Sequence, residues 1–135
     1  IGDIFVARVA GNFENVDILG SLEYSCNVAG SKLILVLGHE SCGAVKAACD
    51  GVELGNITEM LSKIMPAVRK SAVEVEGEAN SSNKAFVAKT VENNVKLTIE
   101  RIRENSQILT EMEDNGEIKI VGGVYSLHTG RVELV

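Results

Sequence analysis

The residues best suited to chemistry stand in one short element, Gly38-His39-Glu40-Ser41-Cys42-Gly43. A histidine and a cysteine three positions apart across a tight turn can reach one metal ion, and an imidazole nitrogen with a thiolate is a donor pair that zinc favours. We therefore treat His39 and Cys42 as candidate metal ligands. The pair also has a plain structural interpretation, a strand-end histidine and a buried cysteine, because zinc needs three or four ligands.

The other cysteines do not complete a metal site by their spacing. Cys49 lies seven residues beyond Cys42 on one predicted helix, which separates them by about 10 Å along the helix axis. Cys26 precedes the strand whose far end carries His39, which places it at the opposite edge of the sheet. We expect both cysteines to be small buried hydrophobes. We expect His128 to be an exposed turn residue.

The segment that leads into the candidate site is strongly apolar. Residues 33–37 are five consecutive apolar residues that do not alternate with polar ones, and Gly38 ends the run. Such a run predicts a strand over 32–37 that is buried on both faces, as in a parallel sheet flanked by helices. Ligands of open α/β sheets bind beyond the carboxyl ends of such strands.

The rest of the chain alternates between strand and helix patterns. In the first half we predict a strand at 4–9, a helix at 17–28 capped by Asp17, a helix at 42–49, and helical spacing over 56–75 broken at Pro66. In the second half we predict a helix at 84–113, a strand at 118–121 and a last strand at 131–135. The strand at 118–121 stops at Gly122-Gly123 and can extend through 124–127. This order predicts one α/β domain over residues 1–135. Its central sheet is mainly parallel, is flanked by helices and ends in a C-terminal antiparallel hairpin.

Composition narrows the classes of function. The chain has 135 residues, 45% hydrophobic and 24% charged, with a net charge of −6. This acidity argues against nucleic-acid and anionic membrane partners, and no apolar run approaches the roughly 20 residues that span a bilayer. Three cysteines cannot all pair within one chain, so we expect a reducing compartment, the cytoplasm.

Around the candidate ligands the chain resembles the β-class carbonic anhydrases. The element Gly38-His39-Glu40-Ser41-Cys42-Gly43-Ala44-Val45 is similar to the family's G-H-x-x-C-G-A-V motif. The resemblance extends over nearly the whole chain, through segments 2–12, 21–24, 94–95, 120–125 and 129–132.

The resemblance implies a zinc enzyme that interconverts carbon dioxide and bicarbonate. It implies that His39 and Cys42 are two of three protein ligands to one zinc ion per subunit. It also implies a homodimer or a larger homo-oligomer, with the active site at a subunit boundary.

The chain departs from the family pattern in one respect. The family takes its third ligand and a catalytic Asp–Arg dyad from a C-x-D-S-R element on an earlier strand, and residues 1–135 contain no such element. We expect the element to precede Ile1, on a strand that lies between those predicted at 4–9 and 32–37, and we expect this chain alone to be inactive. Two alternatives stay open: a non-catalytic oligomerising or metal-binding relative, and an α/β regulatory domain in which His39 and Cys42 are structural.

Overall fold

The sheet in this computed structural model, which describes residues 2–135, has three strands: β1 (Leu33–His39), β2 (Lys119–Tyr125) and β3 (Val132–Leu134). β1 and β2 are parallel, with His39 opposite Tyr125 at the carboxyl end. β2 and β3 are antiparallel, so the strand order is β1-β2-β3. The predicted α/β class with a C-terminal hairpin is confirmed, although the sheet is mixed, with one parallel and one antiparallel pair.

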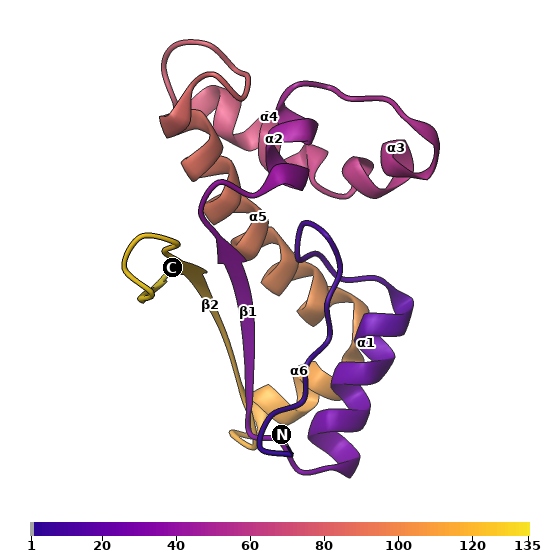
Figure 1. Ribbon diagram of the computed structural model, residues 1–135. Coiled ribbons are helices and arrows are strands. Elements are labelled where there is room, and N and C mark those ends of the chain that lie inside the picture. The colour runs from indigo at the N-terminus through magenta and orange to yellow at the C-terminus, as the bar shows by residue number, and fades with distance from the viewer. Residues whose placement is uncertain (1) are drawn as a thin grey trace.

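Helices flank this sheet. In chain order the helical segments of residues 2–135 are α1 (Val16–Glu23), the π-helical η1 (Tyr24–Val28), α2 (Gly43–Cys49), α3 (Gly55–Ser62), α4 (Met65–Glu74), α5 (Lys84–Asn105) and α6 (Gln107–Asp114). Figure 1 shows α5 running along β1 and β2, with α2, α3 and α4 gathered beyond the carboxyl end of β1. None of the helices in this part of the chain is long and apolar enough to cross a membrane.

Two predicted helices have different bounds because polar side chains cap the backbone. Asn15, and not Asp17, caps α1: its Oδ1 accepts a hydrogen bond from the Ile18 amide at 2.9 Å. The helix predicted over 84–113 is two helices, because Ser106 adopts an extended conformation between them and its hydroxyl oxygen accepts from the Leu109 amide. Serine competes with the helical backbone in this way, so it favours helix caps.

The prediction that the first long strand is buried on both faces is wrong. In β1, Ile34 and Val36 are buried, whereas Leu33, Leu35 and Leu37 on the opposite face are exposed. The buried residues pack with α5 in one core cluster. We call the three exposed side chains the leucine face.

The predicted strand at 4–9 is also wrong. This segment forms no strand, and Ile4 and Val6 are exposed. A strand needs a neighbour to accept and donate its backbone hydrogen bonds, and no strand within residues 2–135 pairs with this segment. Its turn is nevertheless anchored, because the Asn94 Nδ2 donates to the Gly11 carbonyl at 2.7 Å.

β2 does not stop at its glycine pair but continues through it to Tyr125. Gly122 is needed there because α5 packs closely against the strand. A Cβ on Gly122 would lie 2.6 Å from Val95 Cγ1 and 2.8 Å from Ile99 Cδ1. The glycine therefore permits a close approach of helix and strand rather than a turn.

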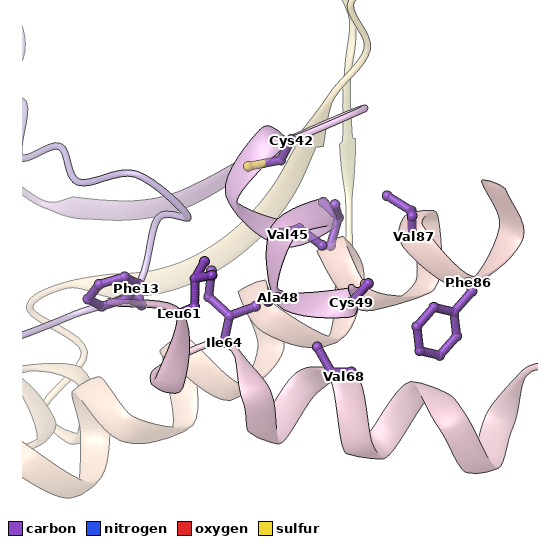
Figure 2. Packing of buried hydrophobic residues seen from close by; sticks show 11 residues of the cluster. Phe13, Cys42, Val45, Ala48, Cys49, Leu61, Ile64, Val68, Phe86 and Val87 are labelled. Atoms are coloured by element: carbon purple, nitrogen blue, oxygen red, sulfur yellow. The ribbon is translucent and has the colours of Figure 1, made fainter. Parts of the chain in front are cut away.

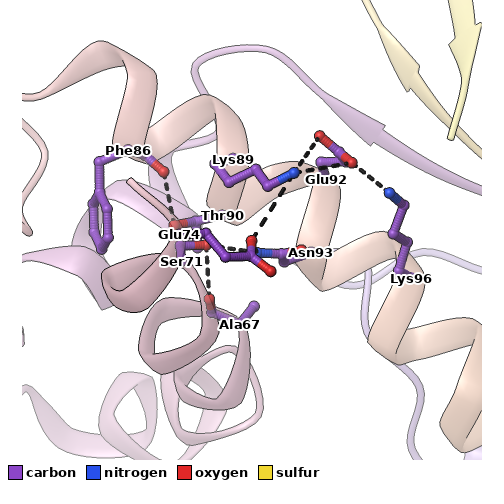
Figure 3. Close-up of polar contacts among 9 residues, drawn as sticks. All are labelled: Ala67, Ser71, Glu74, Phe86, Lys89, Thr90, Glu92, Asn93 and Lys96. Carbon is purple, nitrogen blue, oxygen red and sulfur yellow. Dashed lines mark hydrogen bonds and ion pairs between the residues drawn. The ribbon is translucent and has the colours of Figure 1, made fainter. Parts of the chain in front are cut away.

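The buried side chains form two clusters. One joins β1, β2, α6 and the second half of α5, and the other joins α2, α3, α4 and the first half of α5 (Figure 2). A polar network lies between α4 and α5: the buried Asn93 Nδ2 donates to Ser71 Oγ at 2.9 Å and to a Glu74 carboxylate oxygen at 2.8 Å (Figure 3). Both clusters meet at α5, which therefore links the sheet to the helices beyond its carboxyl end.

Candidate metal site

The candidate ligands lie on the turn between β1 and α2. β1 ends at His39, the chain turns through Glu40 and Ser41, and Cys42 is the N-cap residue of α2. Ser41 adopts a left-handed conformation with φ 54°, which a residue with a side chain rarely adopts without support from its surroundings. The expected placement is thus confirmed, with Cys42 at the cap of the helix rather than inside its first turn.

His39 presents one ring nitrogen for a ligand. Its side chain is exposed, and its Nδ1 donates a hydrogen bond to the Glu40 carbonyl oxygen at 2.8 Å. With the proton on Nδ1, the lone pair lies on Nε2. Metal-binding histidines are oriented in this way, by a hydrogen bond from the second ring nitrogen to a carbonyl or carboxylate oxygen.

Cys42 is buried at the edge of the helical cluster, with 4% of its surface exposed (Figure 2). Its side chain forms no capping hydrogen bond with α2. The thiol is therefore not used to satisfy the helix N-terminus. An imidazole Nε2 and an unused thiol on one turn fit the donor set of a zinc site.

The described residues supply no third ligand beside His39 and Cys42. Among residues 2–135, no group of three or more His, Cys, Asp and Glu side chains is arranged to hold a metal ion. Cys26 and Cys49 are buried, as expected, and burial raises the pKa of both thiols. Cys49 contacts Thr90 Oγ1 at 3.9 Å, and His128 lies in an exposed turn, as expected.

The sequence analysis assigned Glu40 no role, but the structure gives it three sets of contacts. Its amide donates to the Tyr125 carbonyl at 3.0 Å, and its carbonyl accepts from His39. Its Oε2 accepts from Ser126 Oγ at 3.1 Å and from the Leu127 amide at 2.9 Å. The hairpin partners Tyr125, Ser126 and Leu127 lie 85 to 87 residues away in the chain, so local spacing carries no signal for them.

A second group that the sequence did not point to lies beside the end of β1. The Nδ2 of Asn12 and the Oδ1 of Asn94 are buried without a hydrogen-bond partner. Asn12 lies near the site, because a Cβ on Gly38 would lie 3.6 Å from Asn12 Oδ1, and Asn94 binds the carbonyl of the preceding residue, Gly11. Buried polar atoms are nearly always partnered in folded proteins, by protein groups or by ordered water, so these two atoms mark a polar spot beside the end of β1.

The edge of β1 that faces away from β2 is open in the described residues. Within residues 2–135, β1 is hydrogen-bonded to β2 alone. The backbone groups on its other edge pair with no strand in this part of the chain. An apolar strand with a free edge is unusual, because natural sheets cover or pair such edges.

Comparison with known proteins gives this arrangement a family. The family model described as carbonic anhydrase matches residues 1–132. Curated relatives include the carbonic anhydrase of Mycolicibacterium smegmatis, 32% identical over 142 residues, and carbonic anhydrase 2 of Mycobacterium tuberculosis, 32% identical over 139 residues. Each alignment covers 99% of this chain but only 64% and 63% of the relative, so the chain spans less than two thirds of their length.

Solved structures share the fold. The Coccomyxa β-carbonic anhydrase in complex with acetazolamide is 28% identical, with a TM-score of 0.83 over 99% of this chain and 61% of that one. A tetrameric β-carbonic anhydrase from Sordaria macrospora superposes with a TM-score of 0.86 at 23% identity, over 99% of this chain and 68% of that one.

Proposed function

The chain belongs to the β-class carbonic anhydrase family, and from this premise we propose that the whole protein catalyses the zinc-dependent, reversible hydration of carbon dioxide to bicarbonate. The observation that carries the proposal is that the family match over residues 1–132 includes a turn with both His39 and Cys42. Zinc, when bound, acts as a Lewis acid that makes a nucleophile for carbon dioxide available at neutral pH.

In this proposal His39 Nε2 and Cys42 Sγ hold the metal. The Glu40 carbonyl accepts a hydrogen bond from Nδ1 and so fixes the orientation of the imidazole ring. Nε2 is therefore already oriented for a metal ion before the ion binds. Burial of Cys42 keeps its sulfur on the protein side of the turn. The two ligands thus differ: the imidazole faces solvent and the thiol anchors the site to the core.

The third ligand and the Asp–Arg dyad are proposed to come from the family's C-x-D-S-R element, which is not among residues 1–135. Two features support a further strand beside β1: its free edge and the partnerless Asn12 and Asn94 atoms. We propose that residues 1–135 alone do not hydrate carbon dioxide at an enzymatic rate. Two ligands do not hold zinc in the tetrahedral arrangement with one open position that the chemistry uses.

We propose further that the whole protein is a homodimer or a larger homo-oligomer in the cytoplasm. The exposed leucine face is an apolar surface suited to a protein neighbour. All three cysteines are free and buried, which suits a reducing compartment. Sedimentation of the whole protein as a monomer at micromolar concentration would contradict the oligomer.

A second candidate is a non-catalytic relative that binds metal or assembles with other subunits. The observation that favours it is the lack of a three-ligand group among the described residues. It predicts that extension of the chain with the residues encoded before Ile1 restores neither a third ligand nor turnover.

A stopped-flow pH-indicator assay of carbon dioxide hydration decides between these functions. The 135-residue chain and the version extended upstream are compared with added zinc, and His39→Ala and Cys42→Ala in the extended version serve as controls. We expect turnover only in the extended version, and its loss in both variants. Equal turnover by the two lengths would show that the upstream element is dispensable, and no turnover by either would favour the non-catalytic relative.

A further inference from the structure

Glu40 lies between the proposed ligands and is bonded through its amide, its carbonyl and its carboxylate. The amide and the carboxylate both bind the hairpin, at Tyr125, Ser126 and Leu127, while the carbonyl accepts from the His39 ring. The position of the imidazole therefore depends on the position of Glu40. The position of Glu40 in turn depends on the β2–β3 hairpin.

The hairpin turn is itself well ordered by hydrogen bonds, so it can serve as a support. The Ser126 amide donates to the Arg131 carbonyl at 2.8 Å, and the Gly130 amide donates to the Ser126 carbonyl at 2.9 Å. The Ser126 hydroxyl accepts from the Thr129 amide at 3.4 Å while it donates to Glu40. Ser126 thus connects the inside of the hairpin turn to the turn after β1.

We propose that Glu40 is a positioning residue, whose carboxylate fastens the turn that carries His39 and Cys42 to the β2–β3 hairpin. This inference rests on the proposed function, because its purpose is to hold the two proposed zinc ligands in one arrangement. The left-handed Ser41 between them gives the fastening a physical reason. A strained turn keeps its conformation only where its surroundings hold it.

Both side-chain hydrogen bonds end on the same oxygen, Oε2 of Glu40. A glutamine places one carbonyl oxygen, with two lone pairs, at the same distance from the backbone. Glu40→Gln should therefore keep the fastening, whereas Glu40→Ala removes it. This pair of variants separates the geometry of the contact from the negative charge beside the site.

The other end of α2 provides a matched control. There, Asp50 accepts from the Ser81 amide at 2.8 Å and from Ser81 Oγ at 2.6 Å. This contact has the same chemistry, a carboxylate that binds a backbone amide and a serine hydroxyl, but it fastens the loop before α5. Asp50→Ala should therefore affect the fold without moving His39 or Cys42.

The test measures how readily the turn opens in the metal-free chain. Alkylation of Cys42 by iodoacetamide is followed by peptide mass spectrometry, with Cys26 in the other core cluster as the reference for opening of the whole fold. We expect the ratio of the Cys42 rate to the Cys26 rate to rise about tenfold in Glu40→Ala, as for the loss of one charged hydrogen bond. In Glu40→Gln and Asp50→Ala we expect this ratio to stay within about twofold of the original.

A cobalt titration of the same variants in the upstream-extended version, which carries the proposed third ligand, gives the metal readout. The thiolate charge-transfer band is the signal, and Cys42→Ala shows how much of it the other thiolate supplies. We expect Glu40→Ala to weaken Co²⁺ binding about tenfold and Glu40→Gln to restore it. An unchanged alkylation ratio in Glu40→Ala, or a Glu40→Gln variant that behaves like Glu40→Ala, would overturn the proposal. A changed ratio without any cobalt band in the extended version would overturn the zinc site and leave the fastening in place.

Discussion

On one face of β1, Ile34 and Val36 lie under α5 and are at most 7% exposed, whereas Leu33, Leu35 and Leu37 on the other face are 40–56% exposed. All five side chains are aliphatic, so the difference does not come from their chemistry. It comes from what the rest of residues 2–135 places over each face.

The difference shows that an apolar side chain in the sequence predicts burial against some partner but does not say which element or molecule that partner is. On the covered face the neighbour is α5, whose Val95 and Ile99 approach so closely that β2 has a glycine opposite them. On the leucine face no helix or strand of the described chain fills this role. The covered face should therefore determine the stability of this chain, and the leucine face its association.

The largest expected contrast is between neighbours on β1. Ile34→Ala should lower the free energy of unfolding by about 2–5 kcal/mol, since it leaves a cavity in a close-packed cluster. Leu35→Ala should cost less than about 1 kcal/mol, because much of its side chain is already in water. Urea unfolding at two protein concentrations measures both. If Ile34→Ala and Leu35→Ala lost the same free energy of unfolding, the comparison would be contradicted. If Leu35→Ala showed a large loss only at the high protein concentration, a second copy of the chain would be shown to cover this face.

A smaller contrast is expected between the adjacent glycines of β2. Gly122→Ala should destabilise the chain by about 2 kcal/mol, because its Cβ would meet the buried Val95 and Ile99. A Cβ on Gly123 would lie 2.6 Å from Val132 Cγ1 and 3.3 Å from the Glu133 carbonyl oxygen. Val132 is 42% exposed and can rotate away, so only a small shift of the edge strand β3 is then needed. Gly123→Ala should therefore cost less than Gly122→Ala, about 1 kcal/mol. Thermal unfolding of the two variants in the same buffer shows which one loses more stability. A larger loss for Gly123→Ala would show that the sheet is packed more tightly on the leucine face.

The smallest expected effect is a pH-dependent one, from an ion pair between α5 and α6. Arg103 donates to Glu113 at 2.7 Å and 2.8 Å, and this hydrogen bonding lowers the pKa of Glu113 below its ordinary value of 4.5. A lowered folded-state pKa means that the pair stabilises the fold above about pH 4.5. This contribution is lost as the pH falls through the folded-state pKa.

Because Arg103 is 43% exposed, the contribution should be only about 0.5 kcal/mol. Arg103→Met should show it as a loss of stability at pH 7 that becomes smaller at pH 3, below the ordinary pKa of a glutamate. Urea unfolding at both values, with Glu113→Gln as the matched variant, measures it. A loss that is the same at both pH values would assign the role of Arg103 to the packing of its aliphatic stem.

The sequence predicted the parts of the fold that depend on local pattern. The strand over 32–37 and the helix over 42–49 are present within two residues of their predicted bounds. The C-terminal hairpin is also present, with its first strand continued to Tyr125. The placement of His39 and Cys42 followed from the same local signals, an apolar run that ends at Gly38 and a helix pattern that begins just beyond it. Local patterns of this kind are determined by residues close in the chain.

The errors arose where distant residues decide the outcome. The segment 4–9 has a strand pattern but no strand neighbour within residues 2–135, and the glycine pair of β2 permits the approach of α5 instead of ending the strand. Glu40 was missed for the same reason, because Ser126 and Leu127 are not near it in sequence. The break between α5 and α6 could have been predicted from the sequence, because Ser106 is of a residue type that often caps the N-terminus of a helix.

The free edge of β1 has a consequence for handling the chain in solution. Residues 33–38, Leu-Ile-Leu-Val-Leu-Gly, carry no charge and no proline, and their outer backbone groups lack a strand partner within residues 2–135. Short segments with this composition on an open edge can recruit identical strands from other molecules and stack into fibrils. A peptide or a designed strand that occupies this edge should therefore act as a solubiliser of the chain, independently of any metal.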